Sequence, residues 1–244
     1  MNRRIVIAVV AVIIALAIIA FIAERKISPP VKDVYFVLPP HTPPNLVVIR
    51  PAHFVMPASR GNYWQQFTNN GKPATYISGR GVTLKEMIGA AYESSVSRII
   101  FPSDMPTNQF DYLVTVAEKT HEELQAAIKS KFGYMAHRQK MDMDVLALKV
   151  ETPNSPNLIT STNNNRNYIG GKLTHFNVNV LVWPLENRLQ QPVMDETGLT
   201  NFYDFRWNFQ PRDRPTIDKQ LTVLGLRLEP KTESLDMLIV EKAH

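Results

Sequence analysis

Apolar residues run without interruption from residue 5 to residue 23, the longest such stretch in the chain. An α-helix of this length rises about 28 Å, which is enough to cross the hydrocarbon core of a bilayer. Two arginines precede the stretch, and one acidic and two basic residues follow it. We therefore predict a transmembrane anchor over residues 1–26, with the amino terminus in the cytoplasm and the rest of the chain on the periplasmic side of a bacterial inner membrane. A cleavable signal peptide is the alternative interpretation.

The segment after the anchor, residues 27–44, contains six prolines. This composition favours an extended, semi-rigid stalk of polyproline geometry. Its centre is apolar and contains Tyr35, Phe36 and Leu38. A solvated linker has no use for these three side chains together, so they either form a short strand on the protein's own core or lie on a partner. All three are candidate partner-binding residues.

Short runs that favour strands alternate with two helical patterns in the next part of the chain. Thr83 with Glu86, and Thr120 with Glu123, have the spacing of a capping box. Behind each cap, apolar residues recur every three or four positions and form one stripe. Gly133 is a typical helix C-terminal residue. The predicted order is strand, helix, strand, strand, helix, strand, strand, with strand candidates around the second helix at residues 112–117, 134–139 and 145–150.

The second half of the chain repeats this order. The strands expected there are at residues 172–177, 192–194, 203–209, 226–229 and 235–240, and the helices are at residues 178–189 and from residue 216 onward. Two pairs of markers, Phe110 with Phe202 and Gly133 with Gly225, share an offset of 92 residues. Pro184 does not fit the pattern, because proline is unfavourable inside a helix.

These patterns predict an α+β fold with an N-terminal transmembrane helix and a Pro-rich stalk, followed by two tandem βαββαββ modules. The first module covers residues 45–152 and the second covers residues 172–244. The segment between them, residues 153–171, is rich in asparagine and glycine. We interpret it as a polar exposed loop.

Composition narrows the chemistry that the chain can perform. It has 244 residues, of which 44% are hydrophobic and 20% charged, and it contains no cysteine. Disulfides, thiolate zinc sites, iron–sulfur clusters and thiol nucleophiles are thereby excluded. The net charge of +5 is spread along the chain. No two of the six histidines have the i, i+4 spacing of a helical metal site, so we predict no metal and no cofactor. Met135, Met141 and Met143 are compatible with soft-metal capture, but their alternation favours packing.

No motif identifies a catalytic centre, and we assign no catalytic residue. The serines at positions 94, 95 and 97 lack the Gly-x-Ser-x-Gly turn of a hydrolase nucleophile. Asp142 with Asp144 is interpreted as hairpin chemistry. Asp195 is interpreted as the organising residue of a structural turn with Thr197 and Gly198.

Aromatic residues alternate at Tyr203, Phe205, Trp207 and Phe209. Because a strand has a period of two, these rings lie on one face, and we interpret them mainly as core. Arginines between them resemble a nucleic-acid surface, but a periplasmic location argues against nucleic acid. Joint exposure of Trp183 and Trp207 would instead indicate a partner surface, so both tryptophans are candidate partner-binding residues.

A family resemblance is carried mainly by the C-terminal third of the chain. Residues 192–199 read Pro-Val-Met-Asp-Glu-Thr-Gly-Leu, and Tyr-Asp-Phe at 203–205 and Leu-Gly-Leu at 224–226 follow. These segments resemble the C-terminal signature of an uncharacterised protein family expanded in soil bacteria. Ile-Arg-Pro at 49–51, the helix from Thr83 and Phe-Gly-Tyr at 132–134 resemble its earlier landmarks. Glu196 and Asn201 replace the basic residue and the glycine that are usual there.

The resemblance implies binding rather than chemistry. The family has no established activity, and relatives are sometimes joined to membrane sensor peptidases. The repeated unit is also similar to the short N-terminal modules of secretins and TonB-dependent receptors, which are small periplasmic βαββαββ interaction domains.

Three classes of function are compatible with these patterns. The leading hypothesis is a non-enzymatic accessory or structural subunit of a larger inner-membrane complex of the respiratory, photosynthetic or secretory kind, with no nucleic acid or small-molecule substrate. The second is a periplasmic sensor or regulatory domain that partners a membrane peptidase or a TonB-like transducer. The third is a hydrolase with an unrecognised site, which a deep pocket at Asp195, His175 or His137 would favour.

Overall fold

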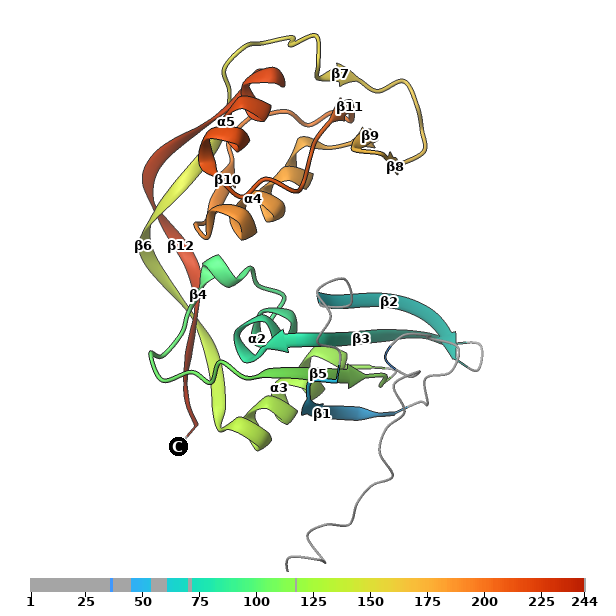
Figure 1. Ribbon diagram of the computed structural model, residues 1–244, viewed down its shortest axis with the longest axis vertical. Helices are drawn as coiled ribbons and strands as arrows, with labels where there is room; N and C mark the ends of the chain where they lie inside the picture. Colours follow the sequence, from blue (N-terminus) through green and yellow to red (C-terminus); the bar gives the residue numbers. More distant parts are fainter. Residues whose placement is uncertain (1–35, 37–44, 54–60, 70–71, 117, 244) are drawn as a thin grey trace, which may run out of the picture. The chain divides into compact units, whose positions relative to one another are not determined.

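A computed structural model describes residues 36, 45–53, 61–69, 72–116 and 118–243 (Figure 1). Residues 44–244 form one compact unit. The predicted anchor and stalk lie outside the described residues, except for Phe36, which is 1% exposed. No helix within the described residues has the length and apolar character needed to cross a membrane. The described part has four α-helices and three four-stranded sheets, so the fold is α+β, as the sequence predicts.

The first sheet has the strand order β1-β5-β3-β2 and is antiparallel. Its strands are β1 (Val47–Pro51), β2 (Gly61–Asn69), β3 (Lys72–Thr83) and β5 (Gln109–Val114). β5 begins and ends about three residues earlier than the predicted strand at residues 112–117, although Thr115 N, just beyond its end, still donates to Leu46 O. The sheet buries one apolar face under two helices.

Those two helices are α2 (Leu84–Ala91) and α3 (Thr120–Phe132). The capping box predicted for α2 is present: Glu86 N donates to Thr83 Oγ1, and Thr83 N donates to Glu86 Oε2. The box predicted for α3 is wrong, because the N-cap residue is Lys119 and the Thr120 hydroxyl turns back to Val116 O. Gly133 ends α3 with φ +70°, the left-handed conformation that suits glycine.

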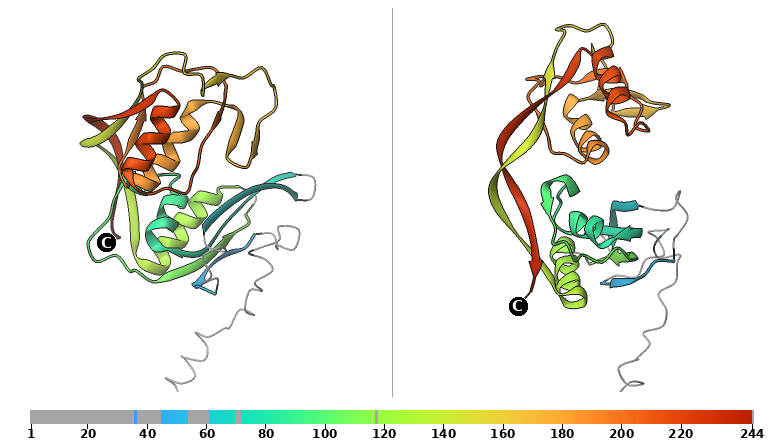
Figure 2. Two further views of the ribbon diagram at one scale, coloured as in Figure 1. Left: turned by 45° about the horizontal axis from the view of Figure 1, so that its top comes forward. Right: turned by 60° about the vertical axis from the view of Figure 1, so that its left-hand side comes forward.

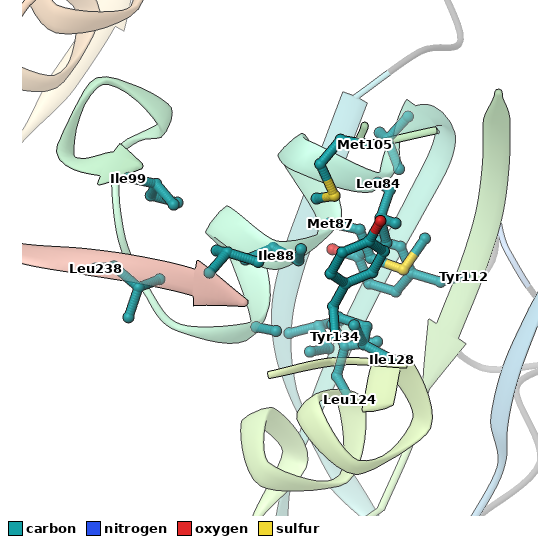
Figure 3. Close-up of a cluster of buried hydrophobic side chains, with 14 of the residues drawn as sticks. Leu84, Met87, Ile88, Ile99, Met105, Tyr112, Leu124, Ile128, Tyr134 and Leu238 are labelled. Carbon is teal, nitrogen blue, oxygen red and sulfur yellow. The ribbon is translucent and has the colours of Figure 1, made fainter. Parts of the chain in front are cut away.

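A first apolar core lies between the sheet and these helices (Figure 3). Leu84, Met87 and Ile88 of α2 and Leu124 and Ile128 of α3 are at most 2% exposed. The capped, striped helices therefore bury the faces that their sequence spacing predicts.

The central sheet has the order β10-β6-β12-β4 and is built on two strands of 17 residues each, β6 (Tyr134–Val150) and β12 (Leu226–Lys242). They pair antiparallel along their whole length, from Tyr134 opposite Lys242 to Val150 opposite Leu226, and twist about each other in the right-hand view of Figure 2. The prediction of two strands in each segment is wrong. Asp142 and Asp144, which had been interpreted as hairpin residues, are exposed residues within β6, opposite Ser234 and Thr232.

Even-numbered residues of β6 and β12 face the helices at both ends of this ribbon. Tyr134 and Leu238 join the first core, whereas Leu148 and Leu228 join a second core. Odd-numbered residues on the other face form a smaller apolar cluster around Val145. Successive side chains continue to point to opposite faces through the polar middle of β6 and β12, so each strand remains continuous.

Two short parallel strands border the ribbon. β4 (Ile99–Ile100), from the first half of the chain, pairs with β12, and β10 (Val193–Asp195), from the second half, pairs with β6. Each half of the chain therefore contributes a strand beside the long strand of the other half.

The third sheet has the order β7-β11-β9-β8, with strands β7 (Ile159–Thr160), β8 (Asn167–Ile169), β9 (Lys172–Phe176) and β11 (Tyr203–Arg206). β7 and β8 lie inside the segment that was predicted to be a loop. Their side chains are exposed, because they are held by backbone pairing to β11 and β9 rather than by burial.

Helices α4 (Val182–Leu189) and α5 (Arg214–Val223) enclose the second core. A 3₁₀ turn, residues 178–181, precedes α4, so Pro184 lies in the first turn of the helix, where its missing N–H has no intrahelical acceptor to lose. Asp213 caps α5 by accepting a hydrogen bond from Thr216 N.

One local arrangement occurs in both halves of the chain. Asp111 Oδ1 accepts from Gly81 N at 2.9 Å, and Asp204 Oδ1 accepts from His175 N at 2.9 Å. Gly81 and His175 have φ of 58° and 60°, and each lies at a register shift between paired strands. A carboxylate thus holds the irregular backbone in each case.

Candidate functional site

Trp183 is a large aromatic side chain on α4, and 66% of its surface is exposed. The opposite side of the helix is buried through Leu185 and Glu186. Asn187, one helical turn after Trp183, lies on the same face and donates from Nδ2 to Trp183 O at 2.9 Å. This face is therefore presented to solvent by a helix that the core holds in place.

Trp183 and Asn187 border a hollow of about 570 Å³. Its other boundary is one face of α2 and the turn that follows it, together with the start of β2. The lining residues from that side are Gly61, Asn62, Val82, Glu86, Gly89, Ala90, Glu93, Ser94, Ser95 and Val96. Glu86, Gly89 and Ala90 lie on α2, whereas Glu93 lies in the turn that follows the helix. Helices α2 and α4 are labelled in Figure 1.

Gly89 permits a tight turn after α2 at the border of this hollow. A Cβ atom added to Gly89 would lie 2.9 Å from Ser94 O, so a larger residue would force apart the turn after α2. Glu93 has φ +49° in that turn, and its side chain is 75% exposed. The turn is further fixed by the Ser94 N to Gly89 O hydrogen bond of 2.9 Å.

The hollow is acidic on a protein that is basic as a whole. Glu86 and Glu93 contribute two carboxylates, and the described lining residues include no lysine or arginine. Two asparagines also line the hollow, and both donate from their side-chain amides to backbone oxygens of the protein: Asn62 to Glu86 O and Asn187 to Trp183 O. The chain carries a net charge of +5. An aromatic ring beside carboxylates is an arrangement that attracts cations.

A buried ion pair fixes α4 beside the end of the first half. Arg98 Nε donates to Glu186 Oε1 at 2.6 Å, and Arg98 Nη2 donates to Val193 O at 2.8 Å. Glu186 Oε1 also accepts from Val193 N at 3.0 Å. The side chain of Glu186 is 3% exposed and that of Arg98 is 29% exposed. Because Glu186 and Trp183 lie on the same helix, these hydrogen bonds also fix the position of Trp183.

Of the five residues predicted to bind a partner, Trp183 is exposed and Trp207 is not. Trp207 is 4% exposed and packs in the second core with Tyr203 and Phe205, as period-two alternation implies. The structure therefore corrects the assignment of Trp207 to a partner surface. Phe36 is buried, and Tyr35 and Leu38 lie outside the described residues.

The residues predicted to form a structural turn are close together. Asp195 Oδ1 accepts from Thr197 N at 3.0 Å and from Thr197 Oγ1 at 2.6 Å, and Gly198 has φ +68°. Glu196, beside this turn, accepts from Lys231 Nζ at 2.6 Å. The hydrogen bond from Lys231 lowers the pKa of Glu196, and the same bond raises the pKa of Lys231. These carboxylates are engaged within the protein.

The histidines considered for a hydrolase are also engaged or remote from the hollow. His175 stacks on Phe202 with ring centroids 4.1 Å apart, and His137 Nδ1 lies 3.5 Å from Glu241 on the ribbon. His121, which is nearer, has Nδ1 3.1 Å from Ala90 O and Nε2 3.7 Å from Glu93. Nδ1 of His121 therefore faces a backbone carbonyl, and Nε2 faces a carboxylate. No group of three or more metal-ligating residues occurs in the described part of the chain.

Sequence reasoning missed Glu86, Glu93 and Asn187 as members of a site. Glu86 was recognised only as a cap. Glu86 and Ala90 share one face of α2, with Glu93 in the turn after it, and Trp183 and Asn187 share one face of α4. About 90 residues separate these two faces along the chain. No local pattern indicates that these two faces border the same hollow.

Comparisons with known proteins place the chain in a family. The fold and the candidate site define a mixed α+β protein with a preformed surface hollow. The chain belongs to DUF3738, a family of proteins of unknown function, whose model matches residues 85–243. No curated protein and no solved structure matches the chain.

Proposed function

We propose that this protein is a non-enzymatic, membrane-anchored periplasmic subunit that binds a partner protein of a larger inner-membrane complex. The observation that carries the proposal is the exposure of Trp183 at the border of the 570 Å³ hollow. Tryptophan is the side chain most enriched among residues that dominate binding energy at protein interfaces. A rigid helix presents it, so little conformational entropy is lost on binding.

The candidate catalytic side chains contact other groups within the protein, and this supports a binding role. Asp195 holds a turn, His175 stacks on a phenylalanine, and His137 lies on a solvated strand beside Glu241. Each has a structural or surface environment that is distinct from the hollow. The periplasmic location rests on the apolar stretch at residues 5–23 and its basic N-terminal flank.

The proposal includes an internal duplication, with two repeated interaction modules of the type found at the start of secretins and TonB-dependent receptors. Strands β6 and β12 begin 92 residues apart, at Tyr134 and Leu226, and end 92 residues apart, at Val150 and Lys242. Glycine ends the segment before each strand, at positions 133 and 225. The carboxylate-held bulges of both halves add a second, independent parallel.

Co-purification tests the proposed function. Full-length protein would be extracted from its own membranes in mild detergent, and the chains that accompany it would be identified by mass spectrometry. We expect Trp183→Ala to reduce the accompanying chains at least tenfold without lowering the melting temperature, because the side chain is largely exposed. Tyr168→Ala, which removes another aromatic side chain of 53% exposure, is the matched control and retains them.

Protease added to intact spheroplasts tests the location. Digestion of the folded region with survival of a short anchor fragment is the expected result. Protection of the whole chain would contradict the periplasmic assignment, and wild-type recovery of partners by Trp183→Ala would contradict the assigned binding surface.

A further inference from the structure

We infer that the hollow beside Trp183 takes a cationic side chain, arginine or lysine, from a segment of the partner protein. This inference rests on the proposed function and specifies the chemistry of its binding site. It uses three features of the same hollow: an exposed indole, two carboxylates and the lack of a basic residue among its described lining.

The indole provides one side of the site. Trp183 is held through α4, because the Arg98–Glu186 pair and the Asn187 hydrogen bond restrict the helix and its backbone. The face of an indole attracts a cation more strongly than any other aromatic side chain, and a guanidinium group can lie flat against it. Because the ring is 66% exposed, a partner side chain reaches it without rearrangement of the core.

The carboxylates provide the other side. Glu86 is held in place because its Oε2 atom accepts hydrogen bonds from Thr83 N at 2.7 Å and from Thr83 Oγ1 at 2.9 Å. Glu93 projects from the turn after α2, and its Oε1 atom lies 3.7 Å from Nε2 of the neighbouring His121. His121 faces Glu93 and Ala90 O, so it adds a positive charge next to the site only when it is protonated. The hollow thus combines two carboxyl groups with space for a chain of methylene groups.

The size of the hollow supports a side chain rather than a folded element. A volume of about 570 Å³ exceeds that of any single residue but is too small for a helix with its side chains. The polar groups at its border, from Asn62, Ser94 and Asn187, suit the backbone of an extended peptide. The occupant is therefore an extended segment with one basic residue inserted between Trp183 and Glu93.

Titration of full-length protein in detergent micelles with two short peptides tests the inference. The probes are acetyl-Gly-Arg-Gly-amide and the same peptide with citrulline, which has nearly the same shape but no charge. The protein has three tryptophans, so ¹⁵N-labelled indole groups give three N–H resonances, and Trp183→Phe assigns one of them. We expect the arginine peptide to shift the Trp183 resonance, with an affinity at least ~5-fold higher than that of the citrulline peptide at low salt.

Two variants locate the charge effect. Glu93→Gln is expected to weaken arginine-peptide binding ~3- to 10-fold, whereas Glu233→Gln, at a partly exposed glutamate on β12, leaves it unchanged. Equal binding of the two peptides, or an equal effect of the two variants, would overturn the cationic occupant.

The peptide titration and the co-purification experiment distinguish failure of this inference from failure of the proposed function. If Trp183→Ala releases the co-purifying partner but the peptides bind equally, the docking surface stands and its chemistry is wrong. If Trp183→Ala retains the partner, the docking surface itself is wrong, whichever peptide binds.

Discussion

Replacement of Arg98 by methionine isolates the contribution of the buried ion pair that positions α4. In the native protein, Glu186 Oε1 accepts from Arg98 Nε and from Val193 N, and Arg98 also donates to Val193 O. Methionine keeps much of the aliphatic volume but leaves the carboxylate with one donor and no compensating charge. Since the Glu186 side chain is only 3% exposed, solvent cannot replace the lost partner.

Removal of one partner from a buried pair costs about 3–5 kcal/mol. Because Arg98 is 29% exposed, we expect a value near the lower end of that range. In a folded unit of this size, 3 kcal/mol lowers the melting temperature by roughly 6–12 °C. Urea unfolding of full-length protein in detergent, followed by circular dichroism, gives the free energy directly.

A double-mutant cycle separates the ion pair from general loss of packing. Glu186→Gln retains an acceptor for Val193 N while removing the charge, so Arg98→Met combined with Glu186→Gln is expected to recover at least ~1.5 kcal/mol relative to Arg98→Met alone. Arg227→Met is the matched control, because the side chains of Arg227 and its partner Glu229 are 52% and 43% exposed, and its cost should stay below ~1 kcal/mol. A loss below ~1 kcal/mol for Arg98→Met, or strict additivity in the cycle, would refute the reasoning.

Three further predictions concern other parts of the fold. Gly225→Ala should be at least ~1 kcal/mol more destabilising in urea unfolding than Gly133→Ala. Both residues have φ near +70°, but an added Cβ at Gly225 would lie 2.6 Å from Thr152 O, whereas an added Cβ at Gly133 would have no atom within 4 Å. Equal costs for the two variants would contradict the steric argument. The lowered pKa of Glu196 contributes stability that is present above its ordinary value of 4.5 and is lost as pH falls below it, so Glu196→Gln should flatten the stability profile in the acid range, and an unchanged profile would count against this role. Leu221→Ala, at a fully buried position of α5, should cost about 2–5 kcal/mol by the same assay, and a cost below ~1 kcal/mol would show that its surroundings collapse into the space.

The sequence predicts helices better than long strands in this protein. α3 ends at Phe132 because Gly133 follows, and its apolar stripe is complete within 13 residues, so every necessary signal is local. β6 was divided in two because polar residues around Asp142 look like a turn. Those residues belong to the exposed even-numbered side of a strand whose odd-numbered side carries Met141 and Met143. The strand stays continuous because it pairs with β12, about 92 residues away, and no local pattern contains that partner.

The candidate site shows the same division between local and distant information. The burial of Trp207 follows from alternation with Phe205, and the exposure of Trp183 follows from its position opposite Leu185 on α4. The neighbourhood of Trp183 with Glu86 and Glu93 depends on how the two halves of the chain are joined through β4, β10 and the Arg98–Glu186 pair. That arrangement is a property of the sheet topology and could not be predicted from either segment.

The pairing of β6 with β12 determines the order in which the protein can fold. β12 comes last of the described strands along the chain, and its two ends supply Leu238 to the first core and Leu228 to the second. During synthesis, neither core can close until β12 has left the ribosome, although all the helices were made earlier. Contacts at this sequence separation form slowly because the intervening chain must first be brought together. Until then, the edge of β6 and the unfilled faces of α2 and α3 remain open to aggregation or to a chaperone.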